Sequence, residues 1–307
     1  MSCPDCFKGH VHEGEPKGKT TKLYDLDTYV IEPSPERPPK GIIVIIPDAF
    51  GWDFVNNRIL ADHYAQKGDY LVYLPDFMRG HSAPLSMLDS VRKVLEPGNM
   101  LAKPYHVCRA LSGAIPMMVR NSIGKSHPIV KDFFVKLRKD QLEKKDGSGL
   151  PIGAAGFCWG GKHALLLARR PPAATASAAS AAADQKTAAA TAAPEPEPLL
   201  IDAVFTGHPS YMQIPEDVEH LAIPVSFAIG EKDAQLGPDK AEKIKSVVEA
   251  LPGQAKGEVR VYKNCAHGFC VRADLSFKDS EVAQQAAEAE DQCIAWFDKY
   301  LKPVGTS

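Results

Sequence analysis

The sequence predicts an α/β protein built on a doubly wound, mostly parallel sheet. Ile42–Ile46 is a continuous β-branched run that ends at Pro47, which is typical of a strand buried on both faces. A helix-like stretch, Phe54–Gln66, and a second short apolar run, Tyr70–Leu74, follow it. A strand, a helix and a strand in this order form a right-handed parallel crossover.

The remaining elements are expected from the same alternation of apolar runs and helix-like stretches. One strand is expected near Tyr24–Ile31, in an otherwise polar opening. Four prolines interrupt His81–Lys125, which predicts short helices over the face that would hold an active site: Pro84, Pro97, Pro104 and Pro116. The other expected strands are Ile152–Phe157, Ile201–Phe205, Val225–Ile229 and Glu258–Tyr262, and the other expected helices are Ile129–Lys145, Gly160–Arg170, Asp239–Leu251 and Ser280–Leu301.

Length and composition bound the domain organisation. The chain has 307 residues, of which 44% are hydrophobic and 24% charged, as in ordinary globular proteins. At a typical length of about 150 residues per domain, the chain would have two domains, but α/β folds of about 200–250 residues often form a single domain. Residues 171–198 contain 13 Ala and five Pro and almost no bulky apolar side chains, so we expect a flexible surface insert there.

Charge, hydropathy and cysteine usage exclude several classes of protein. Because 36 Lys and Arg oppose 38 Asp and Glu, nothing favours binding to nucleic acid or to a membrane surface. The longest apolar run, Gly41–Pro47, is far shorter than the roughly 20 residues that span a bilayer, and Met1–His12 lacks a secretory apolar core. Seven scattered cysteines indicate reduced thiols in a cytosolic setting: Cys3, Cys6, Cys108, Cys158, Cys265, Cys270 and Cys293.

The segment Gly156–Gly160 has the spacing of a nucleophile elbow, G-x-Nuc-x-G, with Cys158 as the nucleophile. It follows a strand-like run and precedes a helix-like one. This turn is so tight that the residues two positions either side of the nucleophile must be very small. It places the sulfur at a helix N-terminus, which favours a thiolate, and aims the N–H of Trp159 at a developing oxyanion. The alternative is an inert buried Cys in a glycine-rich turn.

Two further residues supply the base and the acid that a Cys nucleophile needs. Asp233 follows the expected strand Val225–Ile229, and His267 follows Glu258–Tyr262. Both therefore lie at the C-terminal edge of the sheet, where ligands bind in this architecture. The order nucleophile, acid, His is that of α/β-hydrolases. For Asp233 considered alone, the alternative role is a carboxylate that caps a helix. For His267 considered alone, it is an ordinary loop histidine. With Cys158 they predict a catalytic triad.

The runs Gly156–Gly161, Gly230–Asp233 and Ala266–Phe269 resemble those of the dienelactone hydrolase family, also called carboxymethylenebutenolidases. The resemblance covers about residues 20–302 apart from 171–198. Two further stretches resemble the fungal branch of that family: Ser2-Cys3-Pro4-Asp5-Cys6 with Gly9-His10, and His208-Pro209-Ser210.

This resemblance implies one α/β-hydrolase domain, which we place at 21–302 after a mobile segment at 1–20. It implies a triad of Cys158, Asp233 and His267 that hydrolyses a lactone or an enol ester through an acyl-thiol intermediate.

The resemblance also implies roles around the triad. The N–H of Ala49 would be the second oxyanion donor. Family members often carry Glu where this chain has Asp48, and that carboxylate contacts the resting thiol; the alternative is a loop Asp that binds backbone N–H groups. Arg79 and Arg272 correspond to two Arg residues with which bacterial members bind a substrate carboxylate, although Arg272 is one position further from His267 than in their pattern. The alternative for each Arg is a surface ion pair.

Three other side chains lie near the expected pocket. Trp52 and Trp159 flank it and would shape an apolar acyl site, or else belong to the core. His208 follows the strand Ile201–Phe205 and is a candidate substrate contact, with a structural role as the alternative.

The N-terminal Cys3-x-x-Cys6 with His10 and His12 resembles a zinc-ligand set. However, the four residues lie closer together than structural zinc ligands usually do. We therefore expect a mobile tail with exposed thiols and no metal.

The leading hypothesis is a cytosolic Cys hydrolase of a small-molecule ester or lactone, monomeric or homodimeric, that needs no metal or organic cofactor. Because a thiolate leaves more readily than an alkoxide, a Cys nucleophile favours an activated substrate and argues against a general lipase. One alternative is a family member that has lost hydrolysis and binds a small ligand or a partner. Another keeps the triad but acts on an ester or lactone of a secondary metabolite.

Overall fold

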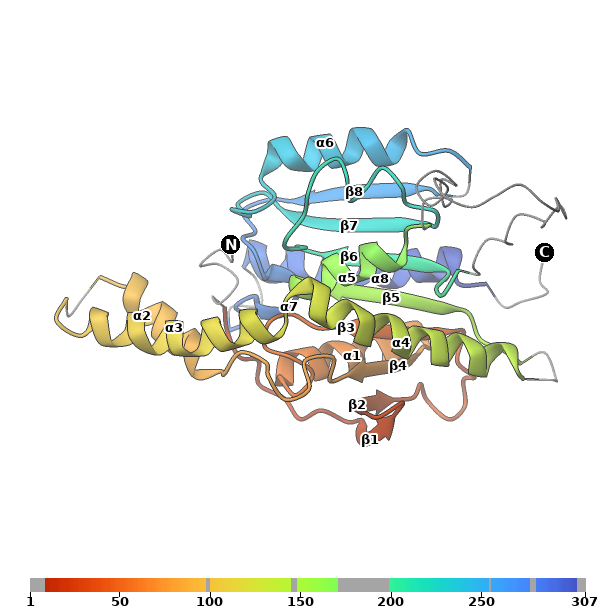
Figure 1. Cartoon of the computed structure of the whole chain (residues 1–307), viewed down its shortest axis with the longest axis horizontal. Helices are drawn as coiled ribbons and strands as arrows, with labels where there is room; N and C mark the ends of the chain where they lie inside the picture. The colour runs from red at the N-terminus through yellow and green to blue at the C-terminus, as the bar shows by residue number, and fades with distance from the viewer. Residues whose placement is uncertain are drawn as a thin grey trace, which may run out of the picture.

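The computed structural model describes residues 9–97, 100–144, 148–170, 199–253, 255–276 and 280–302. One eight-stranded sheet runs through it in the order β1-β2-β4-β3-β5-β6-β7-β8 (Figure 1). The pairs β1–β2 and β2–β4 are antiparallel, and the other neighbouring pairs are parallel. The strands are β1 Lys19–Leu23, β2 Leu26–Ile31, β3 Ile42–Ile46, β4 Leu71–Pro75, β5 Ile152–Phe157, β6 Ala203–Gly207, β7 Val225–Gly230 and β8 Gly257–Tyr262.

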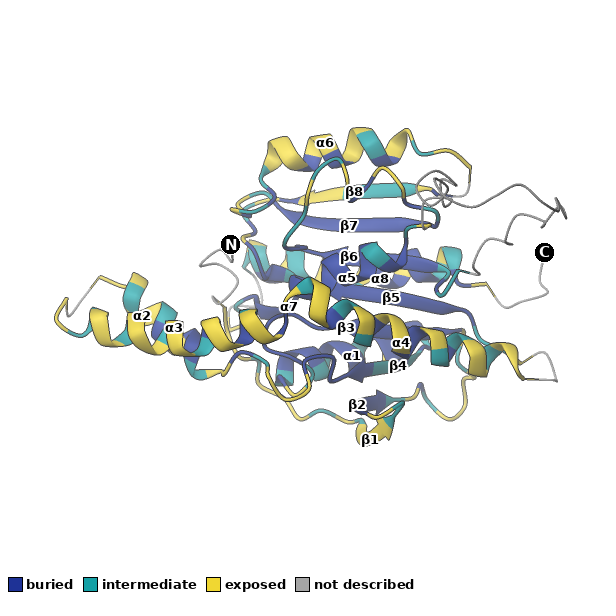
Figure 2. Ribbon diagram, viewed as in Figure 1, coloured by how far each residue is buried: buried dark blue, intermediate teal, exposed yellow. Residues whose placement is uncertain are grey.

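Helices cover both faces of this sheet, so every residue of β3, β5, β6 and β7 is buried (Figure 2). On one face α1, α7 and α8 pack against one another, and α4 and α5 pack together on the other (Figure 1). Strands buried on both faces need continuous apolar runs, and the predicted doubly wound, mostly parallel α/β fold is confirmed. The helices are α1 Val55–Gly68, α2 Ser86–Leu95, α3 Lys103–Arg120, α4 Ile123–Leu142, α5 Trp159–Leu167, α6 Pro238–Glu249, α7 Phe269–Arg272 and α8 Glu281–Tyr300.

The first strand of the sheet is missing from the sequence prediction, which places a single strand near Tyr24–Ile31. The structure has a hairpin of β1 and β2 instead. Tyr24 and Asp25 form its turn with φ values of 50° and 68°, as a two-residue hairpin turn requires. The sequence of β1, Lys-Thr-Thr-Lys-Leu, is almost wholly exposed, so no buried face leaves an apolar alternation to recognise.

The prediction of short helices between His81 and Lys125 holds for α2, which has 10 residues, but is wrong for α3. α3 has 18 residues and continues through Pro116, and α4 begins at Ile123 and continues through Pro128. A proline inside a helix removes one backbone hydrogen bond, and the rest of each helix retains its bonds. α2 and α3 pack side by side and extend beyond the edge of the sheet (Figure 1).

The N-terminal region is described from residue 9 onward; Cys3, Cys6 and the insert at 171–198 lie outside the described residues. Residues 9–18 hydrogen-bond to the domain. The backbone N–H of His10 donates to Arg272 O at 3.1 Å, and that of Lys17 donates to Asp62 Oδ2 at 2.7 Å. The segment before β1 therefore lies against α7 and α1.

Candidate active site

Cys158 lies in a tight turn between β5 and α5. Its backbone has φ 51° and ψ −114°, a conformation that is costly for a residue other than glycine and that clusters at functional sites. A Cβ atom on Gly160 would lie 1.9 Å from the carbonyl oxygen of Ile46, and one on Gly156 would lie 2.6 Å from the carbonyl oxygen of Gly160. Close backbone approach therefore requires both glycines and packs the turn against the end of β3.

Replacing Gly160 with alanine is expected to destabilise the fold by at least about 3 kcal/mol, because the new methyl group meets backbone that cannot move aside. Gly124 is a matched control, since it is also helical and a Cβ there meets nothing within 4 Å. Gly124→Ala should change the stability by at most about 1 kcal/mol. Urea unfolding compares the two variants, and similar stabilities would contradict this packing of the turn.

Asp233 and His267 form a buried pair at the C-terminal edge of the sheet. His267 Nδ1 lies 2.9 Å from Asp233 Oδ2, and neither side chain is exposed. Asp233 Oδ1 accepts hydrogen bonds from the backbone N–H groups of Gln235 and Leu236 at 2.8 and 3.3 Å. A carboxylate held in this way keeps the imidazole proton on Nδ1 and leaves Nε2 facing the thiol.

One further side chain, Ser210, contacts both the thiol of Cys158 and Nε2 of His267. Its Oγ lies 3.2 Å from Cys158 Sγ and 3.3 Å from His267 Nε2. Burial by itself lowers the pKa of His267, but its interactions with Cys158 and Asp233 outweigh burial and raise the pKa to about 9. This balance favours the protonated imidazolium at His267. The structure therefore brings the three residues of the predicted triad together.

The two expected oxyanion donors follow neighbouring strands. Ala49 lies shortly after β3 and Trp159 opens α5 directly after β5, and the two strands are paired. Both residues are buried. The turn at Gly160 packs against the backbone of Ile46 and Pro47, two residues before Ala49. Their role as oxyanion donors remains a prediction.

Asp48 and Arg272 form an ion pair in which neither side chain is exposed. Asp48 Oδ1 also accepts from the backbone N–H of Phe50 and from Asn57 Nδ2, each at 3.1 Å. The Arg272 guanidinium stacks over the Phe50 ring, 5.4 Å from its centroid. The structure thus places the Arg272 charge against Asp48 in the interior. The predicted roles of Asp48 at the thiol and of Arg272 at a substrate carboxylate stay predictions.

The other predicted contact residues differ in exposure. Arg79 is exposed, with φ 50°. Trp52 is half-buried, and the Arg58 guanidinium stacks on it at 4.7 Å. The indole N–H of Trp159 donates to Asn121 O at 2.8 Å, and this side chain is 1% exposed. Of the three, only Arg79 is exposed, and its contact with a substrate carboxylate stays a prediction.

His208 is wholly buried beside His267, with the two rings edge to face and 5.0 Å apart. Within the part of the chain that the structure describes, neither of its ring nitrogens has a hydrogen-bond partner. Burial, with His267 and Arg272 nearby, holds its pKa well below the usual value. His208 is therefore a neutral side chain packed behind the base, and contact with a substrate remains a prediction for it.

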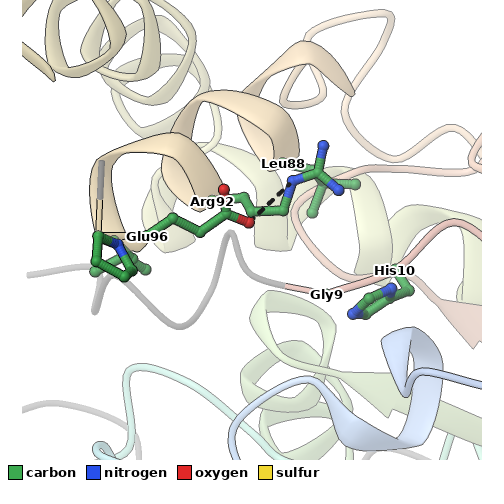
Figure 3. A pocket seen from close by; sticks show the side chains of 7 residues that line it. Gly9, His10, Leu88, Arg92 and Glu96 are labelled. Carbon is green, nitrogen blue, oxygen red and sulfur yellow. Dashed lines mark ion pairs between the residues drawn. The ribbon is translucent and has the colours of Figure 1, made fainter. Parts of the chain in front are cut away.

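A cavity of about 390 Å³ lies between the N-terminal segment and α2 (Figure 3). Its lining includes His10, Leu88, Arg92 and Glu96, and Arg92 Nε lies 3.8 Å from Glu96 Oε1. None of the triad residues lines it. Among the residues that the structure describes, no group of His, Cys, Asp and Glu side chains is arranged to hold a metal ion.

The model of the dienelactone hydrolase family matches residues 26–301. The chain belongs to the dienelactone hydrolase family. The predicted family is thus confirmed, and it makes this protein a hydrolase of carboxylic esters or lactones that acts on a small molecule.

Fungal relatives resemble this dienelactone hydrolase family member over almost its whole length. It is 24% identical to the hydrolase pyvD of Aspergillus violaceofuscus, over 97% of this chain and 96% of that protein. It is 26% identical to the hydrolase tropI of Talaromyces stipitatus, over 98% and 97%. A dienelactone hydrolase structure from Anabaena variabilis superimposes with a TM-score of 0.50, at 15% identity over 95% of this chain and 100% of that one. The predicted α/β-hydrolase fold is confirmed.

Sequence reasoning missed three side chains that hold this site together. Asn57 supports Asp48, Gln235 donates from Nε2 to Ser210 Oγ at 3.0 Å, and Ser210 contacts both Cys158 and His267. Ser210 is noted in the sequence only as part of the His-Pro-Ser run that resembles the fungal branch. The signal that would have found it is its position directly after a buried strand, at the same sheet edge as the triad.

Proposed function

We propose that this dienelactone hydrolase family member cleaves an activated ester or lactone through an acyl-thiol intermediate on Cys158. The observation that carries the proposal is the buried pair of His267 and Asp233, with the imidazole beside a thiol in a strained strand-to-helix turn. An acid, a base and a nucleophile in this arrangement are the parts that acyl transfer needs.

The reaction proceeds in two stages. In the first, the Cys158 thiolate attacks the carbonyl carbon, while the N–H groups of Ala49 and Trp159 bind the oxyanion. The C–O bond then breaks, and the His267 imidazolium gives its proton to the leaving oxygen. In the second, His267 takes a proton from water, the hydroxide attacks the thioester, and the acid departs as the thiolate and the imidazolium form again. Asp233 holds the imidazole throughout.

The nucleophile sets the substrate class. In the tetrahedral intermediate a thiolate is a better leaving group than an alkoxide, so the intermediate from an ordinary alkyl ester returns to substrate. An enol or phenol oxygen is a better leaving group and lets the thioester form. We therefore propose enol lactones and aryl or enol esters of small molecules as substrates. The relatives named as dienelactone hydrolases and carboxymethylenebutenolidase homologues support this choice.

A substrate panel and a pH profile test this proposal. The expected result is turnover of an aryl acetate and an enol lactone, with the matched ethyl ester slower by at least about 10²-fold. Because the pKa of His267 is raised to about 9, kcat/KM should fall as the pH rises through that value, where the imidazolium that protonates the leaving oxygen is lost. Equal rates on the aryl and ethyl esters would contradict a thiol mechanism.

We also propose that the enzyme is cytosolic and that it is a monomer or a homodimer. Both proposals rest on the sequence. Within the described ranges, none of the helices has the length and apolar character that crossing a membrane requires.

A further inference from the structure

We propose that Ser210 is a fourth catalytic residue, whose hydroxyl donates a hydrogen bond to the Cys158 thiolate. The inference rests on the proposed function, since it assigns a role around the same nucleophile. Ser210 follows β6, whereas Cys158 follows β5, and the strands are neighbours in the sheet. The serine therefore reaches the sulfur from the next strand along.

Backbone contacts fix Ser210 against the turn that carries Cys158. The N–H of Ser210 donates to Cys158 O at 2.9 Å, and the N–H of Cys158 donates to Gly207 O at 3.2 Å. Pro209 packs on the first turn of α5, where a Cβ on Gly161 would lie 2.6 Å from Pro209 Cβ. Ser210 itself is 1% exposed. Its hydroxyl therefore has a defined position and little competition from water.

The hydrogen-bond partners of this hydroxyl decide the direction of its proton. Gln235 Nε2 donates to Ser210 Oγ at 3.0 Å. The Nε2 proton of an imidazolium at His267 is the one that faces the thiolate. A thiolate can only accept. Because Gln235 already donates to the oxygen and the sulfur can only accept, we assign the one hydroxyl proton of Ser210 to Cys158 Sγ, 3.2 Å away.

This arrangement has a chemical consequence for the thiolate. A hydrogen bond to a charged acceptor stabilises it more strongly than a bond between neutral groups, and the low-dielectric interior increases the effect. The Ser210 hydroxyl thus adds a third stabilising contact to those of the imidazolium and the helix N-terminus. It holds the nucleophile ionised before substrate arrives.

The test is the pH dependence of Cys158 alkylation by iodoacetamide in Ser210→Ala and wild type, read from the mass of the Cys158 peptide. The peptide readout is needed because Cys108 is exposed and also reacts. The midpoint of the profile should rise by about one pH unit in Ser210→Ala, so that alkylation well below the midpoint slows about tenfold. Gln235→Leu removes one donor to the hydroxyl. It should also raise the midpoint, but by less than Ser210→Ala does.

Ser226→Ala is the matched control. Ser226 is also a buried serine that hydrogen-bonds to side chains, here Glu258 and Gln292, but it lies in β7 away from the thiol. It should leave the midpoint unchanged. If Ser210→Ala had the same midpoint as the wild-type protein, the inference would be overturned, while Cys158 would remain the proposed nucleophile. A wild-type midpoint no lower than that of a free cysteine, about 8.5, would overturn the proposed function and this inference with it.

Discussion

Replacing Cys158 with alanine is expected to lower kcat/KM for an activated ester by at least about 10³-fold, the scale on which loss of a triad nucleophile acts. The reason is that the proposed mechanism depends on attack by the Cys158 thiolate. The turn and the proposed oxyanion donors should stay in place, so the residual rate is expected to reflect positioning and electrostatic stabilisation alone. Steady-state kinetics on an aryl acetate measures the change.

Two comparisons make this result specific. Cys108→Ala removes an exposed thiol on α3 and should leave kcat/KM unchanged. Thermal unfolding should show that Cys158→Ala folds as well as wild type, because Cys158 occupies a strained position that is tolerated equally by alanine. If Cys158→Ala retained more than about a tenth of wild-type activity, another residue would be the nucleophile.

Replacing Asp48 with alanine is expected to destabilise the protein by about 3–5 kcal/mol, because Arg272 would keep a buried charge without its partner. Neither side chain of the pair is exposed, so the unpaired charge would lie in the low-dielectric interior. Phe50 and Asn57 would also lose the acceptor for their hydrogen bonds. Urea unfolding at neutral pH measures the difference in the free energy of unfolding.

The double variant Asp48→Ala, Arg272→Met separates the charge from the packing. It removes both charges, so it should recover much of the stability that Asp48→Ala loses. Asp132→Ala is the exposed counterpart, since it breaks a pair with Lys136 one helical turn away on the surface, and it should leave the stability nearly unchanged. If Asp48→Ala were as stable as Asp132→Ala, the ion pair would not be formed as described.

The fold could be predicted where burial leaves a pattern in the sequence. β3 is buried on both faces and is therefore a pure β-branched run, and the glycines around Cys158 are required by backbone contacts. β1 leaves no such pattern because it is exposed. α3 could not be predicted from local signals, since a proline inside a helix normally kinks or ends it and α3 continues through Pro116.

The candidate site could be predicted only in part, for a related reason. Asp233 and His267 each follow a recognisable strand, so their convergence on Cys158 follows from the topology. Asp48 and Arg272 lie 224 positions apart, and nothing local in either segment indicates that one neutralises the other. Ser210 likewise depends on which strands are neighbours, which becomes known only once the sheet order is fixed.

The most direct test of the central claim is to identify the acylated residue. The enzyme is mixed with an aryl ester whose acyl group is released slowly, quenched in acid, digested, and mapped by mass. The account predicts one acyl group on the Cys158 peptide, removed by neutral hydroxylamine as a thioester is, and absent in His267→Ala. An acyl group on Ser210, or turnover with no acylated peptide at all, would contradict it.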